Sequence, residues 1–284
     1  MAWTPTVTPG TKVQLTVAGT MKLLEGCMSL SGPGASKPLT DITALSDTAQ
    51  KFKGGRPNYG KIGMECAFDP IDPSHLKLFT AFALVPGVAV ACEVAGTENG
   101  AKAAVFSAMF DELGLSIPNE GPVMVKSGAT ITTAITLATA TSITPSAIFA
   151  PIVGQGTVLG LWVTSAYVTI LGATNFEISG ASRAMIPVTA LSAAAPTFLA
   201  GVPNNGKLTF DLLWDSSDAN HALLFAAYQA ANQTDRIKIT LTNTAASTIT
   251  LNPVIIDGFE FNTSKDAPNL VKVSATINTP IAIV

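Results

Sequence analysis

An internal repeat restricts the possible folds of this chain more than any other feature of its sequence. Shifted by 146 positions, the sequence matches itself over residues 43–131 without a net gap. Residues 43–46 and 189–192 both read Thr-Ala-Leu-Ser, and residues 55–61 and 201–207 both read Gly-x-Pro-Asn-x-Gly-Lys. A self-match at one fixed spacing indicates a structural unit that is encoded twice. The chain is therefore predicted to contain two tandem domains of similar fold.

The repeat also places the boundary between the two domains. The end of the first copy recurs at the end of the second: Pro122, Val125, Lys126, Ala129, Thr130 and Ile131 become Pro268, Val271, Lys272, Ala275, Thr276 and Ile277. Residues 138–156 are rich in Ala, Thr, Ser and Pro, a composition typical of a linker. We therefore expect a first domain at 1–142, a linker or extended arm at 143–156, and a second domain at 157–284.

Each copy is predicted to be mainly β, because short apolar–polar alternations bounded by turn residues run through both. The clearest alternation is at residues 271–277, where Val, Val, Ala and Ile occupy every second position. Strands are expected at residues 12–17, 61–68, 88–94, 113–117 and 123–131, and again at 158–163, 207–214, 236–241, 258–261 and 270–277. The expected fold class is two similar β-sandwich or barrel domains.

One short helix is predicted in each copy. Asp72 is a favourable N-cap and Pro73 fits the first helical position, after which Leu78, Phe79 and Phe82 form an apolar stripe. The counterpart begins after Asp218 and carries Leu224, Phe225 and Tyr228 in the matching places. A helix packed on a small sandwich or barrel would bury this stripe.

The composition excludes several classes of protein. Sixteen basic and 19 acidic residues give a net charge of −3, which argues against binding of nucleic acid by phosphate neutralisation. Charged residues make up 12% of the chain and hydrophobic residues 48%, so the chain is not disordered. So few charges indicate a surface that other protein covers. The first residues do not resemble a secretory signal.

The stretch between Lys126 and Glu177 contains no charged residue, so a membrane span must be weighed. Pro and Gly interrupt its first part, and β-branched residues fill the rest. The repeat aligns its residues 159, 161 and 163 with residues 13, 15 and 17, which alternate with polar residues. The stretch is therefore expected to contain a strand, and no membrane partner is expected.

Three patterns resemble chemical sites, and each has a simpler interpretation. Residues 55–61 nearly form a phosphate-binding loop, but Ile62 stands where Ser or Thr should hold magnesium, and a strand follows. His75 and His221 could serve acid–base catalysis, yet no nucleophile is nearby, so hydrogen bonding to local backbone is preferred. Cys27, Cys66 and Cys92 have no paired spacing, which indicates neither a disulfide scaffold nor zinc and favours a reducing cytosol. No catalytic, cofactor-binding or metal-binding residue is predicted, and no enzyme activity.

The order of short motifs in both copies resembles long-tailed phage tail tube proteins. In the first copy the motifs are Gly10-Thr11-Lys12-Val13-Gln14-Leu15, the run from Gly26 to Pro33, Asp41-Ile42-Thr43-Ala44-Leu45-Ser46, Gly60-Lys61-Ile62 and Phe68-Asp69-Pro70-Ile71-Asp72. In the second they are Phe176-Glu177-Ile178-Ser179-Gly180, Val188-Thr189-Ala190-Leu191 and Trp214-Asp215-Ser216-Ser217-Asp218. The motifs are short and diffuse, and the resemblance covers most of the chain.

This resemblance implies a β-sandwich or barrel with a flanking helix and a long hairpin or arm. It also implies rings stacked into a hollow tube for genome delivery, and partners in the tape-measure, tail terminator and tail-tip proteins. Such rings usually hold six single-domain subunits, so a two-domain chain predicts a homotrimeric, pseudo-hexameric ring. Double-stranded DNA would pass through the lumen without specific binding. The protein would belong to the virion, in its tail, after assembly in the host cytoplasm.

Two other functions stay open. A tandem β-sandwich adhesin or virion decoration protein would share the fold and would more readily be monomeric. A hydrolase using His75 or His221 would lose turnover when both are replaced. The sequence also leaves open whether the tail is contractile.

Overall fold

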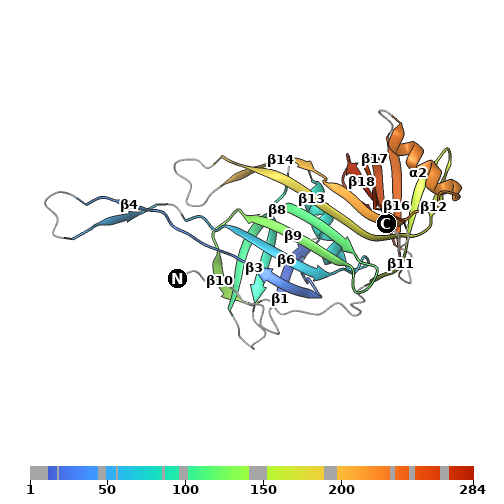
Figure 1. Cartoon of the computed structure of the whole chain (residues 1–284). Coiled ribbons are helices and arrows are strands. Elements are labelled where there is room, and N and C mark those ends of the chain that lie inside the picture. The colour runs from blue at the N-terminus through green and yellow to red at the C-terminus, as the bar shows by residue number, and fades with distance from the viewer. Residues whose placement is uncertain are drawn as a thin grey trace.

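A computed structural model gives the fold of the chain. It describes residues 12–17, 19–43, 49–55, 57–84, 87–95, 102–140, 152–188, 197–230, 234–242, 247–262 and 269–284. Within these residues the protein is mainly β, with two helices and a 17-stranded sheet in which neighbouring strands run antiparallel. Figure 1 shows that the strands of both halves belong to one body. The fold class predicted from the alternation of apolar residues is confirmed in this respect.

The elements follow one order in each half. The first half contains β1 (Lys12–Val17), β2 (Thr20–Leu23), β3 (Cys27–Ser31), β4 (Leu39–Asp41), β5 (Phe52–Gly54), β6 (Lys61–Ala67), α1 (Pro73–Ala83), β7 (Val90–Ala95), β8 (Lys102–Ile117), β9 (Met124–Ile131) and β10 (Thr136–Thr139). The second half contains β11 (Val153–Val163), β12 (Ala166–Ile170), β13 (Ala173–Pro187), β14 (Phe198–Asn204), β15 (Lys207–Leu213), α2 (Ala219–Gln229), β16 (Asp235–Thr242), β17 (Thr248–Asn262), β18 (Leu270–Ile277) and β19 (Ala282–Ile283).

The strand registers of the two halves correspond at the spacing of the sequence repeat. Lys61 pairs with Thr130 between β6 and β9, and Lys207 pairs with Thr276 between β15 and β18, in each case 146 positions later. A β-bulge interrupts β8 next to Glu112 and interrupts β17 at the matching place, next to Gly258. The strand registers of the two halves therefore repeat at the same 146-residue spacing as the sequence.

The two helices begin in the same way. Asp72 accepts a hydrogen bond from the backbone N–H of Ser74 at 2.7 Å, and Asp218 accepts one from Asn220 at 2.7 Å. A capping carboxylate satisfies a backbone donor that the first turn of a helix leaves without an intrahelical partner. The predicted N-caps are therefore confirmed, and each helix covers the core of its own half.

The histidine of each helix bonds to backbone groups outside the helix. His75 Nδ1 accepts from the N–H of Asp69 at 2.9 Å, and its Nε2 lies 3.0 Å from the carbonyl oxygen of Glu25. His221 makes the matching contacts, with the N–H of Asp215 at 3.0 Å and the carbonyl oxygen of Leu171 at 2.8 Å. The preferred interpretation of both histidines as backbone partners agrees with these contacts.

The two halves join where β13 pairs with β8. Phe176, Ile178 and Ala181 of β13 lie opposite Ile117, Leu115 and Leu113 of β8, and all six side chains are buried. The predicted strand at 113–117 covers only the end of β8, which begins at Lys102, and no strand was predicted at β13. This strand-to-strand joint places both halves in one continuous sheet.

The long hairpin of each half projects beyond its own sheet. Figure 1 shows the β4–β5 hairpin of the first half extending away from the body, whereas β14 of the second half lies over the first half. Arg183 of β13 donates a hydrogen bond to the carbonyl oxygen of Phe82 in α1. The β13–β14 hairpin of the second half therefore packs on the first half. The β4–β5 hairpin lies at the opposite end of the molecule from α2 (Figure 1).

The predicted linker at 143–156 lies partly outside the described residues, which resume at residue 152. Its last part is already regular, because β11 begins at Val153, opposite Thr242 of β16. The predicted strand at 158–163 lies within β11, so the uncharged stretch contains a strand as expected. Among the described residues, neither helix has the length and apolar character needed to cross a bilayer.

Candidate functional site: a hydroxyl-rich and acidic groove along the joined sheet

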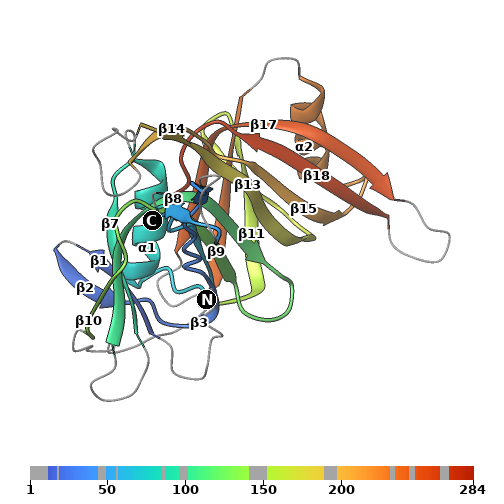
Figure 2. The ribbon, with the colours of Figure 1, turned by 90° about the vertical axis from the view of Figure 1, so that its left-hand side faces the viewer.

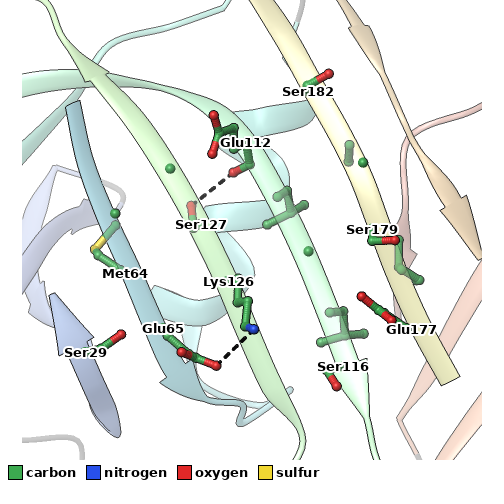
Figure 3. Close-up of a pocket in the computed structure, with 18 of the residues that line it drawn as sticks. Ser29, Met64, Glu65, Glu112, Ser116, Lys126, Ser127, Glu177, Ser179 and Ser182 are labelled. Atoms are coloured by element: carbon green, nitrogen blue, oxygen red, sulfur yellow. Dashed lines mark hydrogen bonds and ion pairs between the residues drawn. The ribbon is translucent and has the colours of Figure 1, made fainter. Parts of the chain in front are cut away.

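A shallow groove of about 710 Å³ runs across the open face of the sheet at the joint between the halves. It crosses five neighbouring strands in the order β3, β6, β9, β8 and β13. Figure 3 shows its side chains standing on these strands. The polar lining residues are Ser29, Ser31, Glu65, Glu112, Ser116, Lys126, Ser127, Glu177, Ser179 and Ser182. Residues of both halves line the groove together, so we treat it as the candidate site.

Strand alternation produces the chemistry of this face. Residues 112–116 of β8 all border the groove, but Glu112 is exposed and Gly114 and Ser116 are half-buried, while the side chains of Leu113 and Leu115 between them are buried. Successive side chains of a strand point to opposite faces of a sheet, so one strand can serve a core and a polar surface together. The groove therefore has a rigid floor whose back is the hydrophobic core.

The lining carries three carboxylates and one ammonium group. Lys126 lies 3.4 Å from Glu65 across β6 and β9, so the one lysine of the groove is held by a carboxylate of the groove (Figure 3). Glu112 pairs at 3.1 Å with Lys61, which lies outside the lining. The charge that the face presents is therefore acidic, set among neutral hydroxyl groups.

Glycines keep the floor of the groove low. Gly63, Gly114, Gly128 and Gly180 all line it. A Cβ at Gly128 would lie 2.9 Å from the Glu112 carboxylate, and one at Gly114 would lie 3.3 Å from the carbonyl oxygen of Ile178. Larger residues at Gly128 and Gly114 would crowd these neighbours and narrow the groove.

A carboxylate holds the bulge of each half, and in the first half, beside the groove, this carboxylate is buried. Asp111 accepts a hydrogen bond from Thr130 at 2.6 Å and lies 2.9 Å from the ammonium group of Lys61. Partial burial works against the charge of Lys61, but hydrogen bonds and charge from Asp111 and Glu112 raise the pKa of Lys61 overall. The near-match to a phosphate-binding loop thus ends in a lysine that holds a strand bulge.

The second half repeats this contact with one additional donor. Asp257 accepts from Thr276 at 2.6 Å and from Ser274 at 2.7 Å, and its carboxylate lies 2.8 Å from Lys207. Burial alone would raise the pKa of Asp257, but the hydrogen bonds from Lys207, Thr276 and Ser274 hold it below its usual value. Both bulges are therefore fixed by the same Lys–Asp–Thr arrangement.

The other sequence candidates lie away from the groove. His75 and His221 are buried beneath their helices. Cys27 of β3 stands opposite Cys66 of β6, a proximity that their spacing in the sequence did not indicate, and both are free thiols. Across the described part of the chain, no three His, Cys, Asp or Glu side chains gather closely enough to share a metal ion.

The groove was not predicted from the sequence, because serine, glycine and glutamate have no spacing signature of their own. The one available signal was the alternation in residues 176–179, where Phe and Ile alternate with Glu and Ser. No strand was predicted at this run. Residues 176–179 become part of the sheet because β13 pairs with β8.

Comparison with known proteins adds one structural similarity. No protein-family model matches the chain, and no curated protein matches it. Among solved structures, the chain is similar to a component of the anti-feeding prophage baseplate, determined by cryo-electron microscopy with 6-fold symmetry. The match has a TM-score of 0.38 and 15% identity, and it covers 48% of this chain and 97% of the other.

Proposed function

We propose that this chain is a structural subunit of a phage tail tube. Three copies would form a pseudo-hexameric ring, and rings would stack into a hollow conduit for genome delivery. One observation carries the proposal: β8 of the first half pairs with β13 of the second. The equivalent strand edges, one in each half, have no such partner among the described residues. The proposal assigns the chain an architectural role and no reaction.

The leftover edges suit head-to-tail assembly. By the repeat, residues 112–116 of β8 correspond to residues 258–262 of β17, and residues 177–183 of β13 correspond to residues 31–37. Among the described residues, 258–262 pair with β18 alone and Ser31 pairs with β6 alone. An edge with unpaired N–H and C=O groups is a template for another strand. Head-to-tail contacts between unlike edges form a ring when their rotation closes.

The chemistry of the groove suits a lumen. Its carboxylates and hydroxyl groups give phosphate oxygens no excess of positive charge to bind, so a passing duplex would release no condensed counterions to the wall. The matching positions of the second half include Asp211 and Glu260, which continue the acidic character. In the proposed ring, this face lines the channel, and DNA passes without being held.

The remaining partners follow from the same proposal. The tape-measure protein would fill the channel during assembly, and the terminator and tail-tip proteins would close its two ends. The finished tube would be part of the virion and would be assembled in the host cytoplasm.

Electron microscopy of the purified full chain tests the function. We expect hollow, striated tubes. If no tubes form, we expect rings, and sedimentation at increasing protein concentration should give them the mass of three chains. A protein that stays monomeric throughout contradicts the proposal and favours an adhesin or decoration protein. Unchanged tubes from a variant with both His75 and His221 replaced would exclude a role for these histidines in assembly.

A further inference from the structure

Matched positions of the two halves differ sharply in exposure on one surface. Phe82, Met109 and Leu115 of the first half are 2%, 6% and 2% exposed. Their counterparts in the second half, Tyr228, Ile255 and Phe261, are 38%, 38% and 47% exposed. All of them are large apolar or aromatic residues in equivalent elements, so the difference reflects a neighbour that the second half lacks.

In the first half that neighbour is the β13–β14 hairpin. Arg183 bonds to the carbonyl oxygen of Phe82, and its guanidinium lies over the Phe82 ring, 5.6 Å from the centroid. A side chain at Gly87 would collide with Ala200 of β14 and with Met109. Leu115 is covered along the joint, where it lies opposite Ile178.

The β4–β5 hairpin of the first half corresponds by the repeat to the β13–β14 hairpin, but among the described residues no helix of the same chain packs against it. Residues 34–37 read Gly-Ala-Ser-Lys, and their counterparts at 180–183 read Gly-Ala-Ser-Arg. Ser36 bridges to Asn58 as Ser182 pairs with Asn204, so the two backbones follow the same path. Ala181 and Arg183 are buried, whereas Ala35 and Lys37 are exposed.

The described strands of this hairpin carry exposed apolar side chains. Leu39, Ile42 and Phe52 are all more than half exposed, at 66%, 52% and 51%. Phe52 aligns with Phe198 of β14 in the repeat. Large exposed apolar groups on a projecting element indicate a surface that is covered in an assembly.

The opposite end of the chain carries an aromatic surface to match. Trp214, Phe225 and Tyr228 lie with Phe259 and Phe261 in one cluster, in which ring centroids are 5.2 Å apart between Phe225 and Phe259 and 5.7 Å between Tyr228 and Phe259. Figure 2 shows α2 next to β17 and β18 on the side of the molecule away from α1. The hairpin of the same copy projects in the other direction (Figure 1), so it cannot cover this cluster.

We propose that the β4–β5 hairpin and residues 31–37 of one copy cover α2 and the β17 edge of the next copy. The inference rests on the proposed function and gives the ring contact its register. Ala35 would lie opposite Phe259, as Ala181 lies opposite Leu113, and Ser31 would lie opposite Asn262, as Glu177 lies opposite Ser116. Lys37 would take the place of Arg183, with its ammonium group over the Tyr228 ring and bonded to the Tyr228 carbonyl oxygen.

A cysteine pair tests the register in the full chain. Ser31 and Asn262 are exposed, and directly opposed residues of paired strands bring their Cβ atoms within about 5.5 Å. We expect Ser31→Cys/Asn262→Cys to give disulfide-linked products of up to three chains under mild oxidation with oxidised glutathione. For each disulfide that two cysteine thiols form, one molecule of oxidised glutathione is reduced to two molecules of glutathione thiol. The two single variants and the shifted pair Ser31→Cys/Glu260→Cys serve as controls.

A charge reversal tests the hairpin independently. Lys37→Glu should dissociate the assembly at concentrations at which wild type is intact, and Lys22→Glu, on exposed β2, should not. Assemblies that persist in Lys37→Glu, or that cross-link equally in the shifted pair, would overturn the proposed contact and leave the tube function standing. A wild-type chain that never assembles would overturn both.

Discussion

Arg183 of the second half donates a hydrogen bond to the carbonyl oxygen of Phe82 in the first half, and its guanidinium stacks on the same residue's ring. The contact connects segments 101 residues apart in the chain. Together with the β8–β13 pairing, it holds the halves at one angle. In the proposed ring, the same angle between neighbouring domains, repeated around the axis, must bring the last domain back to the first.

Removal of this contact should weaken the connection between the halves. We expect Arg183→Ala to lower the free energy of unfolding by about 1.5–3 kcal/mol, the range for hydrogen bonds made by charged groups. Arg236→Ala is the matched control, because Arg236 also lies over a ring, that of Trp162 at 5.2 Å, but on the surface. Its effect should be about 0.5–1 kcal/mol. Urea denaturation measures both, and equal losses would contradict the structural role of Arg183.

The N-caps predict a pair of similar effects in the two halves. Asp72→Ala and Asp218→Ala each remove the acceptor for a first-turn N–H, which costs about 1 kcal/mol of stability. Asp72 is buried, so its replacement should be at least as damaging as that of Asp218. Thermal unfolding followed by circular dichroism measures the loss, with exposed Glu120→Ala as the control. A variant with an unchanged midpoint would show that the capping bond contributes nothing.

Gly60 and Gly206 should resist substitution by alanine. Both have positive φ, at 69° and 77°, and a Cβ at Gly60 would lie 2.5 Å from the carbonyl oxygen of Gly34. Gly19 is the control for backbone strain without steric crowding, because its φ is 81° and nothing lies within 4 Å of a Cβ placed there. Gly19→Ala should lose about 1–2 kcal/mol from the left-handed conformation alone, and Gly60→Ala distinctly more. Soluble yield and the urea midpoint of the three variants test this order.

Stability should fall as the pH drops below neutrality. Burial lowers the pKa of His75, although Glu25, Asp72 and Asp69 act in the opposite direction. Because the folded pKa lies below the unfolded value of about 6.5, the unfolded state takes up a proton first. The stability that neutral His75 contributes is fully present above the unfolded pKa and is lost as the pH falls toward the folded pKa. Melting temperatures from pH 8 to pH 5 should decline in wild type and more gently in His75→Gln. Parallel curves would contradict this origin.

The elements that the sequence predicted best are those whose pattern is local. The alternation of Val271, Val273, Ala275 and Ile277 predicted β18, and all four side chains are buried. The helices were predicted from Asp72 and Asp218 because capping depends on residues within one turn. β6 and β9 were also located to within one residue at each end.

The elements that were missed depend on distant partners. β13 contains Gly180 at φ 73° and a register shift between Ile178 and Ala181, both of which weaken a local strand pattern. Its pairing with β8 on one side and β15 on the other makes it a strand. The first part of β8 was missed because the bulge at Asp111 reverses the alternation in its middle. The groove depends on both elements, so local patterns could not reveal it.

Reversal of the groove's charge should create DNA binding. Ser29→Lys/Glu177→Lys places two ammonium groups on the floor of the groove and removes one carboxylate, on strands at its opposite sides. We expect this variant to bind a short duplex with an affinity that falls steeply as salt rises, since each neutralised phosphate releases counterions. Thr136→Lys/Glu120→Lys makes the same change in charge outside the groove lining. Fluorescence anisotropy at two salt concentrations should separate the pairs. If the control binds equally, net charge and not the groove sets DNA affinity, and the acidic lining has no special role in letting the duplex pass.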